Sequence, residues 1–148
     1  MLEQKEVNPF NYFDTEEDVL NFTKNVIKSN KDDPLENASI MLANSIIFYI
    51  VENCIKENWN IYNIKKLIKM CSTEEKPSTI DVMFGDLDAN SNALSFYKCY
   101  KIASGDNYEA VIKDCLEKFD SFEIKKNKNT LLKRLIRKIK GVKKNEVR

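Results

Sequence analysis

ASIMLANSIIFYIVENCI, residues 38–55, is the segment that decides the fold, because it is apolar on nearly every side. At helical spacing one face carries Ala38, Met41, Leu42, Ser45, Ile46, Tyr49 and Ile50. Much of the other side carries Ile40, Ile47, Phe48, Val51, Cys54 and Ile55. A helix that is apolar nearly all round is buried by neighbours on several sides. We therefore expect this helix at the centre of the domain.

The start of this central helix is marked in the sequence. Asp33 is a favourable N-cap residue, and Pro34 suits the first helical position, where a missing N–H costs nothing. We expect the helix to continue until it frays near Asn58. A membrane-spanning helix is the alternative, but the uncharged run ends at Val51 and falls short of the ~18–20 residues that a span needs. The sequence favours a buried core helix.

The chain of 148 residues is long enough for one domain with its own core. Its four cysteines have no close pair and no metal-ligand spacing. Three of them, Cys54, Cys71 and Cys115, fall among apolar residues at helical spacing, so we expect reduced thiols in the core. Reduced thiols favour a cytoplasmic location. The polar first residues, MLEQKEVN, do not resemble a signal peptide, which agrees with that expectation.

Charge is distributed very unevenly along the chain. Residues 1–124 contain 13 Lys and Arg against 22 Asp and Glu, a net charge of −9. Residues 125–148 contain 11 Lys and Arg against one Glu, a net charge of +10. A basic tail on an acidic body indicates that only the tail would be attracted to polyanions.

Helical signals continue on both sides of the central segment. Asp14 is expected to cap the first helix, with Glu17 in the capping-box position. Asn60 and Ser78 are expected to cap two later helices, and Gly105 is expected to end another in the left-handed αL conformation. Besides the central helix, the expected helices span residues 14–29, 60–70, 78–87, 92–104, 107–122 and 130–140.

These signals predict an all-α, single-domain bundle of about six to seven helices around a buried central helix. We divide the chain into a lead segment (1–13), a helical domain (14–124) and a basic amphipathic C-terminal tail (125–148). No run with strand periodicity and no internal repeat interrupts this pattern.

Residues suited to catalysis are scarce. The chain has no histidine, and none of its three glycines lies in a phosphate-binding frame. Asp86, Asp88 and Asn90 begin like a calcium-binding loop, but Ser91 and Tyr97 stand where that loop needs Gly and Glu. We therefore predict no catalytic residues, no metal site and no cofactor, and a chain that is not itself an enzyme.

The tail is the one candidate binding element. Its cations could contact phosphates of nucleic acid or an acidic partner, or lie on an anionic membrane surface. Alternatively, Leu131, Leu135, Ile136 and Ile139 dock on the bundle and leave the cations solvated. The tail could also fold against the chain's own acidic body. The candidate site residues are Lys133, Arg134, Arg137, Lys138, Lys140, Lys143 and Lys144.

Five segments in order carry a resemblance to a known family. They are NPFNYF (8–13), EEDVLNFTKNVI (16–27), DPLENASIMLANSIIFYI (33–50), IDVMFGDL (80–87) and ALSFYKCYKIASGDNYEAVIKDCLEKFDSF (93–122). Together they resemble the all-alpha domain of type IV coupling proteins, the TraG/TraD-class ATPases of conjugative DNA transfer and type IV secretion. The chain differs from the usual family pattern at Leu35-Glu36, at Ser39 and at Gly105-Asp106-Asn107.

The resemblance implies a non-catalytic, cytoplasmic domain that recognises transfer substrates. Its expected partners are a relaxase or relaxosome accessory protein, the motor domain of the coupling ATPase and DNA. The alternative is a stand-alone or truncated helical interaction or regulatory protein of a mobile genetic element, whose basic tail binds nucleic acid or a membrane surface.

Overall fold

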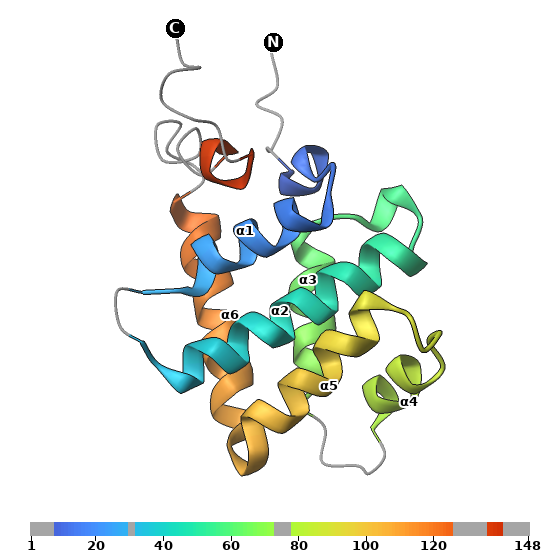
Figure 1. Ribbon diagram of the computed structural model, residues 1–148. Helices are drawn as coiled ribbons and strands as arrows, with labels where there is room; N and C mark the ends of the chain where they lie inside the picture. Colours follow the sequence, from blue (N-terminus) through green and yellow to red (C-terminus); the bar gives the residue numbers. More distant parts are fainter. Residues whose placement is uncertain (1–7, 30–31, 73–77, 126–135, 141–148) are drawn as a thin grey trace, which may run out of the picture.

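The computed structural model describes residues 8–29, 32–72, 78–125 and 136–140 (Figure 1). These residues form helices joined by short turns and loops and contain no strand, which confirms the predicted all-α bundle. In chain order the elements are η1 (Pro9–Tyr12), α1 (Glu16–Ile27), α2 (Pro34–Asn53), η2 (Lys56–Asn58), α3 (Ile61–Met70), α4 (Thr79–Gly85), α5 (Asn92–Ser104), η3 (Gly105–Asn107) and α6 (Tyr108–Lys125). A further helical turn covers residues 136–140.

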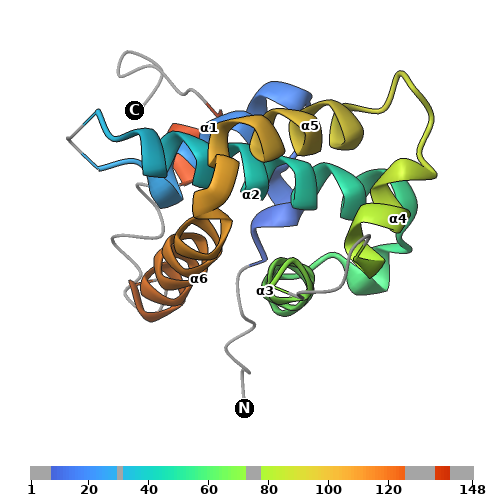
Figure 2. The same cartoon turned by 90° about the horizontal axis from the view of Figure 1, so that it is seen from below.

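The central helix is α2, as predicted. It packs against α1, α3, α5 and α6, and Figure 2 shows α1 and α5 on one side of it and α3 and α6 on the other. Its length and composition alone would let it cross a membrane, but 67% of its apolar window is buried inside the bundle. The buried residues of α2 are Glu36, Ala38, Ser39, Ile40, Leu42, Ala43, Asn44, Ser45, Ile46, Ile47, Phe48 and Ile50.

The start of α2 was predicted correctly, whereas its end was not. The Asp33 side chain accepts a hydrogen bond from the Leu35 amide at 2.9 Å, and Pro34 occupies the first turn. The helix ends at Asn53, before the predicted Asn58, because the chain becomes extended at Cys54. The Trp59 indole N–H donates to the carbonyl oxygen of Cys54 at 3.0 Å and holds this break. Residue Ile55, expected on an apolar helical face, is 64% exposed.

The predicted cap of α1 was wrong by one residue. Thr15, and not Asp14, is the N-cap, because its hydroxyl accepts from the Asp18 amide at 3.3 Å. The Asp18 carboxylate in turn accepts from the Thr15 amide at 3.0 Å. Asp18 therefore completes the capping box in place of Glu17.

The other predicted helix ends are close to those observed. Asn60 caps α3 and Ser78 caps α4, as expected. Gly105 follows α5 with φ +52°, a value that favours glycine, but its ψ of −126° lies outside the predicted αL region. The last long helix begins at Tyr108 and continues to Lys125, three residues beyond the predicted Phe122.

Aromatic side chains tie the described part of the lead segment to the core. The Phe10 side chain is 3% exposed, and its ring centroid lies 6.0 Å from that of Trp59. Phe13 packs edge-on against Phe22 at 5.4 Å, and Phe22 packs edge-on against Phe122 at 5.4 Å. Because edge-to-face contacts at these distances are favourable, η1 belongs to the same core as α1 and α6.

All four cysteines are free thiols, in agreement with the absence of a disulfide framework. Cys71 and Cys115 are buried, Cys54 is half-buried and Cys99 is exposed. Burial raises the pKa of the Cys71 thiol to about 12 and that of Cys115 well above its usual value. These two thiols are therefore protonated and serve as small apolar core groups.

A partly buried ion pair joins the beginning of α2 to α6. The Lys118 ammonium donates to Glu36 at 2.8 Å, and the Ser29 amide and hydroxyl donate to the other oxygen of Glu36 at 3.0 and 2.9 Å. Asp114 lies 3.3 Å from Lys118 and accepts from the Ser39 hydroxyl at 2.7 Å. The hydrogen bonds from Lys118 and Ser29 outweigh burial and lower the pKa of Glu36 to about 2.

Residues 136–140 pack on α1. Ile139 is 1% exposed, and the Asn21 side-chain amide donates to its carbonyl oxygen at 3.4 Å. The Lys140 ammonium lies 2.5 Å from a carboxylate oxygen of Asp14 and 3.5 Å from one of Asp18. Ile139 therefore belongs to the core, and Lys140 pairs with the acidic start of α1.

Glu36 should make the stability of the protein depend on pH. Its pKa is about 2 in the folded chain and 4.5 when unperturbed, so the unfolded chain takes up the proton first as the pH falls. The stabilisation is fully present above pH ~5 and is lost between pH ~4.5 and ~2. We expect Glu36→Gln to lose about 2–3 kcal/mol at neutral pH and to flatten this acid-dependent decrease.

The measurement is urea unfolding, followed by the fluorescence of Trp59 across this pH range. The control is Glu117→Gln, on the exposed side of α6, which should unfold like the native chain. An unchanged acid dependence in Glu36→Gln would contradict the role of this ion pair.

Ile139 should contribute to stability although the tail lies far from α1 in sequence. Removing a buried isoleucine side chain leaves a cavity, so we expect Ile139→Ala to lower the free energy of unfolding by about 2–4 kcal/mol. Arg137→Ala, at an exposed position of the same turn, should change it by less than about 0.5 kcal/mol. Equal urea midpoints for the two variants would show that residues 136–140 do not dock on α1 in solution.

Candidate docking surfaces

The structure places only part of the predicted tail site. Arg137, Lys138 and Lys140 lie in the described turn 136–140. Lys133, Arg134, Lys143 and Lys144 lie outside the described residues. The side chains of Arg137 and Lys138 are exposed, whereas Lys140 is half-buried against α1.

Lys140 meets the acidic body of the chain. Its hydrogen bond to Asp14 is the largest cause that raises the pKa of its ammonium group. Burial opposes ionisation of Asp18, but the Asp14 and Thr15 amides and the Lys140 ammonium together lower the pKa of its carboxyl group. Of the described tail cations, Lys140 therefore already has partners within the chain, and Arg137 and Lys138 face solvent.

A groove opens where η1, α1, α2 and α5 meet. It has a volume of about 270 Å³ and combines aromatic side chains with three carboxylates. We call it the acidic groove. It is lined by Phe13, Asp14, Thr15, Glu16, Val19, Phe48, Val51, Glu52, Trp59 and Asn92.

Two carboxylates of the acidic groove are held by uncharged donors. The Asn92 side-chain amide donates to Glu16 at 2.6 Å, and the Ser91 hydroxyl donates to Glu52 at 2.9 Å. Neither Glu16 nor Glu52 forms an ion pair within the described part of the chain. Their negative charges are thus fixed in position by the beginning of α5 without being neutralised.

The aromatic side chains of the acidic groove are held by the core. Phe48 is 4% exposed and stacks on Phe96 with ring centroids 5.6 Å apart. Trp59 donates its indole N–H to Cys54, and the Lys56 ammonium lies 5.7 Å from its ring. A cation already sits over this indole ring, which is the geometry of a cation–π contact.

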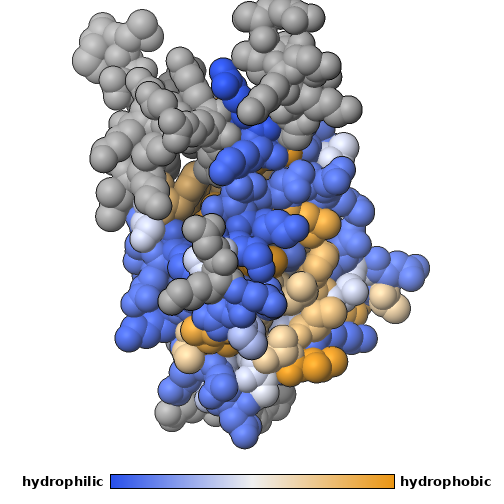
Figure 3. All heavy atoms as spheres, turned by 60° about the vertical axis from the view of Figure 1, so that its left-hand side comes forward, coloured by the Kyte–Doolittle hydropathy of each residue, from blue (hydrophilic) through white to orange (hydrophobic). Residues whose placement is uncertain are grey.

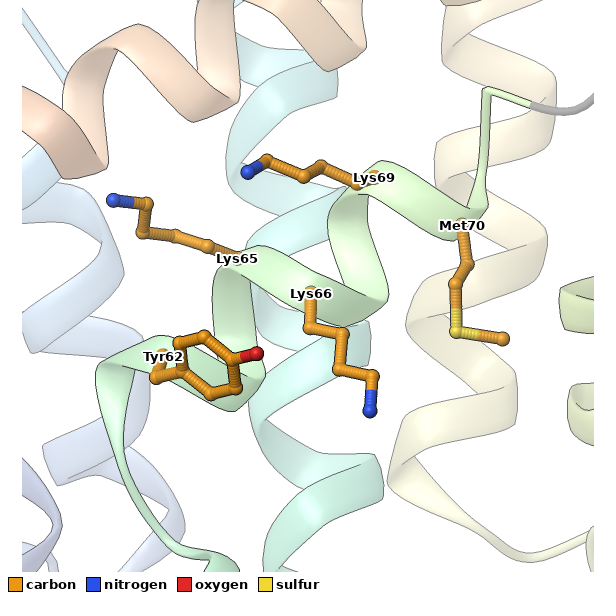
Figure 4. Close-up of a pocket in the computed structure, with 5 residues that line it drawn as sticks. All are labelled: Tyr62, Lys65, Lys66, Lys69 and Met70. Atoms are coloured by element: carbon orange, nitrogen blue, oxygen red, sulfur yellow. The ribbon is translucent and has the colours of Figure 1, made fainter.

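A second depression lies on the outer surface of α3 and has a volume of about 500 Å³. Its charged side chains are lysines, whereas those of the acidic groove are carboxylates. We call it the α3 face. Figure 4 shows the residues that line it, Tyr62, Lys65, Lys66, Lys69 and Met70.

Figure 3 shows one face of the molecule, on which most described side chains are hydrophilic and a band of apolar side chains crosses between them. Among the described residues, the most exposed large apolar side chain is that of Ile102, at 84%. Nothing in the structure indicates what would cover this residue.

Neither docking surface was predicted from the sequence. The acidic groove draws its residues from segments that the sequence separates, so only the fold brings Glu16, Glu52 and Trp59 together. The α3 face had a local signal, because Ile61–Met70 contains three lysines and no acidic residue. The tail has a higher density of cations than α3, so it dominates the charge pattern of the sequence.

Metal ligands are not clustered among the described residues, where no group of three or more Cys, Asp and Glu side chains could hold an ion. In the segment that begins like a calcium loop, the Asp88 side chain accepts from the Asn90 amide at 2.9 Å. Such a contact closes a local turn.

Comparisons with known proteins give no further guide to this site. No protein-family model, no curated protein and no solved structure matches the chain. The assignment of function therefore depends on the chemistry of the surfaces themselves.

Proposed function

We propose that the chain is a non-catalytic helical docking domain whose acidic groove receives a basic segment of a protein partner. The observation that supports this most strongly is the pair of carboxylates, Glu16 and Glu52, held beside aromatic side chains without a neutralising cation. Such a site has a fixed negative charge and an apolar wall. It therefore favours a cation on a long apolar stem.

Arginine fits this description better than lysine. Its planar guanidinium can donate hydrogen bonds to two carboxylates while one face stacks on an aromatic ring. The volume of about 270 Å³ is small for a cofactor and suits one or two long side chains. The partner segment is thus an extended or helical stretch that presents arginine.

Residues 1–124 have a net charge of −9, so the surface around the groove also favours a basic partner. The resemblance to the all-alpha domain of type IV coupling proteins supports a relaxase or relaxosome accessory protein as that partner. In this proposal the chain works with the motor domain of a coupling ATPase in conjugative DNA transfer.

The proposal is tested by removing the two charges without removing the hydrogen bonds. Glu16→Gln/Glu52→Gln keeps oxygen acceptors for Asn92 and Ser91 but has no carboxylate. Because each exposed ion pair contributes up to about 1 kcal/mol, we expect a labelled Gly-Arg repeat peptide to bind roughly five- to thirtyfold more weakly. Fluorescence anisotropy at low salt measures the affinity.

The matched control is Glu109→Gln/Glu117→Gln, which removes the same charge from exposed positions of α6. Because these two charges lie outside the groove, their removal should change the peptide affinity by less than about twofold. Equal weakening by both double variants would assign the binding to overall charge and reject the groove. Pull-down of a cognate relaxase by the two variants tests the identity of the partner separately.

A further inference from the structure

We propose that the α3 face binds single-stranded nucleic acid, with Lys66 and Lys69 on phosphates and a base stacked on Tyr62. This site is separate from the acidic groove and from the tail. It would let the domain contact a nucleic-acid strand while the groove holds a basic protein.

The α3 face is positively charged, although residues 1–124 as a whole are negatively charged. Residues 1–124 have a net charge of −9, yet Ile61–Met70 contains three lysines and no acidic residue. The inward side of α3 is anchored in the core by Ile61, Ile64 and Ile68, which are at most 4% exposed. The lysines therefore project from a fixed helix and not from a loop.

The three lysines are not equivalent. Lys65 lies 2.7 Å from Asp120 and 2.6 Å from Glu123, so α6 already neutralises its charge. Lys66 and Lys69 form no ion pair within the described part of the chain. Both have exposed side chains. Lys66 and Lys69 are therefore the exposed cations of this surface, and no described carboxylate neutralises them.

Tyr62 supplies an aromatic surface beside these cations. Its side chain is 72% exposed, although most large apolar side chains of the described residues are buried. Figure 4 shows its ring next to Lys66 on the same side of α3. An exposed aromatic ring next to lysines is the pattern by which proteins hold single strands, because every base has a face that can stack.

The length of the surface sets the length of the ligand. From Tyr62 to Lys69 the helix rises by roughly 10 Å, at about 1.5 Å per residue. At the rise of about 3.4 Å per nucleotide of a strand stacked as in a duplex, this span corresponds to about three nucleotides. Paired bases cannot stack on a protein side chain without leaving the duplex, so Tyr62 favours a single strand.

An anionic membrane surface is the competing ligand for lysines beside a tyrosine. A membrane presents its charge over a wide plane, and the acidic body around α3 is repelled by such a plane. A single nucleic-acid strand is narrow enough to contact the lysines of α3 without approaching the acidic surface around them. The distribution of charge therefore favours nucleic acid.

The experiment measures the affinity of the full chain for a fluorescent single-stranded oligothymidylate over a range of salt concentrations. Lys66→Gln/Lys69→Gln should weaken binding and reduce the steepness of log affinity against log salt by about 1.4, since a single strand contributes about 0.7 per phosphate contact. The control Lys98→Gln/Lys113→Gln removes the same charge from exposed positions of α5 and α6 and should leave the slope unchanged.

Tyr62 is tested by two substitutions. Tyr62→Ala should weaken binding roughly five- to a hundredfold through loss of stacking, and Tyr62→Phe should retain the native affinity. Circular dichroism of each variant checks that α3 is still folded. Tyr62 is exposed, so neither change should alter the fold.

Three results would overturn the proposal. The first is that the native chain does not bind the oligothymidylate at low salt. The second is that Lys66→Gln/Lys69→Gln has the same salt slope as its control variant. The third is that Tyr62→Ala binds the oligothymidylate as tightly as the native chain. Loss of binding to phosphatidylserine vesicles in the lysine variant, with unchanged oligothymidylate binding, would assign the face to a membrane surface. The Glu16→Gln/Glu52→Gln variant should keep the native salt slope, so failure of the acidic groove and failure of this site are distinguishable.

Discussion

The structure depends on the need to cover α2 on several sides. Burial of large side chains such as Leu42, Ile46 and Ile50 contributes about 1.5–3 kcal/mol each, and all three have no exposed surface. No single neighbouring helix can cover residues that point in several directions. The helices α1, α3, α5 and α6 are therefore all held against α2.

Covering α2 also fixes which side chains remain outside. Ile61, Ile64 and Ile68 turn the inner side of α3 to the core, so Tyr62, Lys66 and Lys69 face solvent. Packing α5 on α2 brings the amide of Asn92 to Glu16 and the hydroxyl of Ser91 to Glu52. One core thus positions two surfaces of opposite charge, the acidic groove and the α3 face.

Local signals in the sequence predicted local structure well. Asp33-Pro34, Asn60 and Ser78 marked helix starts correctly, because each cap contacts an amide only two or three residues away. The start of α1 was misassigned because Asp14 and Thr15 are both favourable caps and both have an acidic residue three positions later. The choice of Thr15 is made by the Asp18 carboxylate, which accepts from the amides of both.

Features that depend on distant residues were not predictable in the same way. The end of α2 is set by Trp59, whose indole holds the extended carbonyl of Cys54. The acidic groove needs four elements to meet, and no single segment of the sequence contains its pattern. The docking of the tail on the bundle was one of several alternatives, and the structure shows it for Ile139, which is buried and whose carbonyl oxygen accepts from Asn21.

Native-state hydrogen exchange tests most directly whether α2 is the common core. If all the neighbouring helices are held by α2, the amides of residues 42–50 should exchange only when the whole domain unfolds. Their free energy of exchange should then equal the free energy of unfolding from urea titration. Exchange of these amides at a clearly lower free energy than those of α5 or α6 would contradict the account.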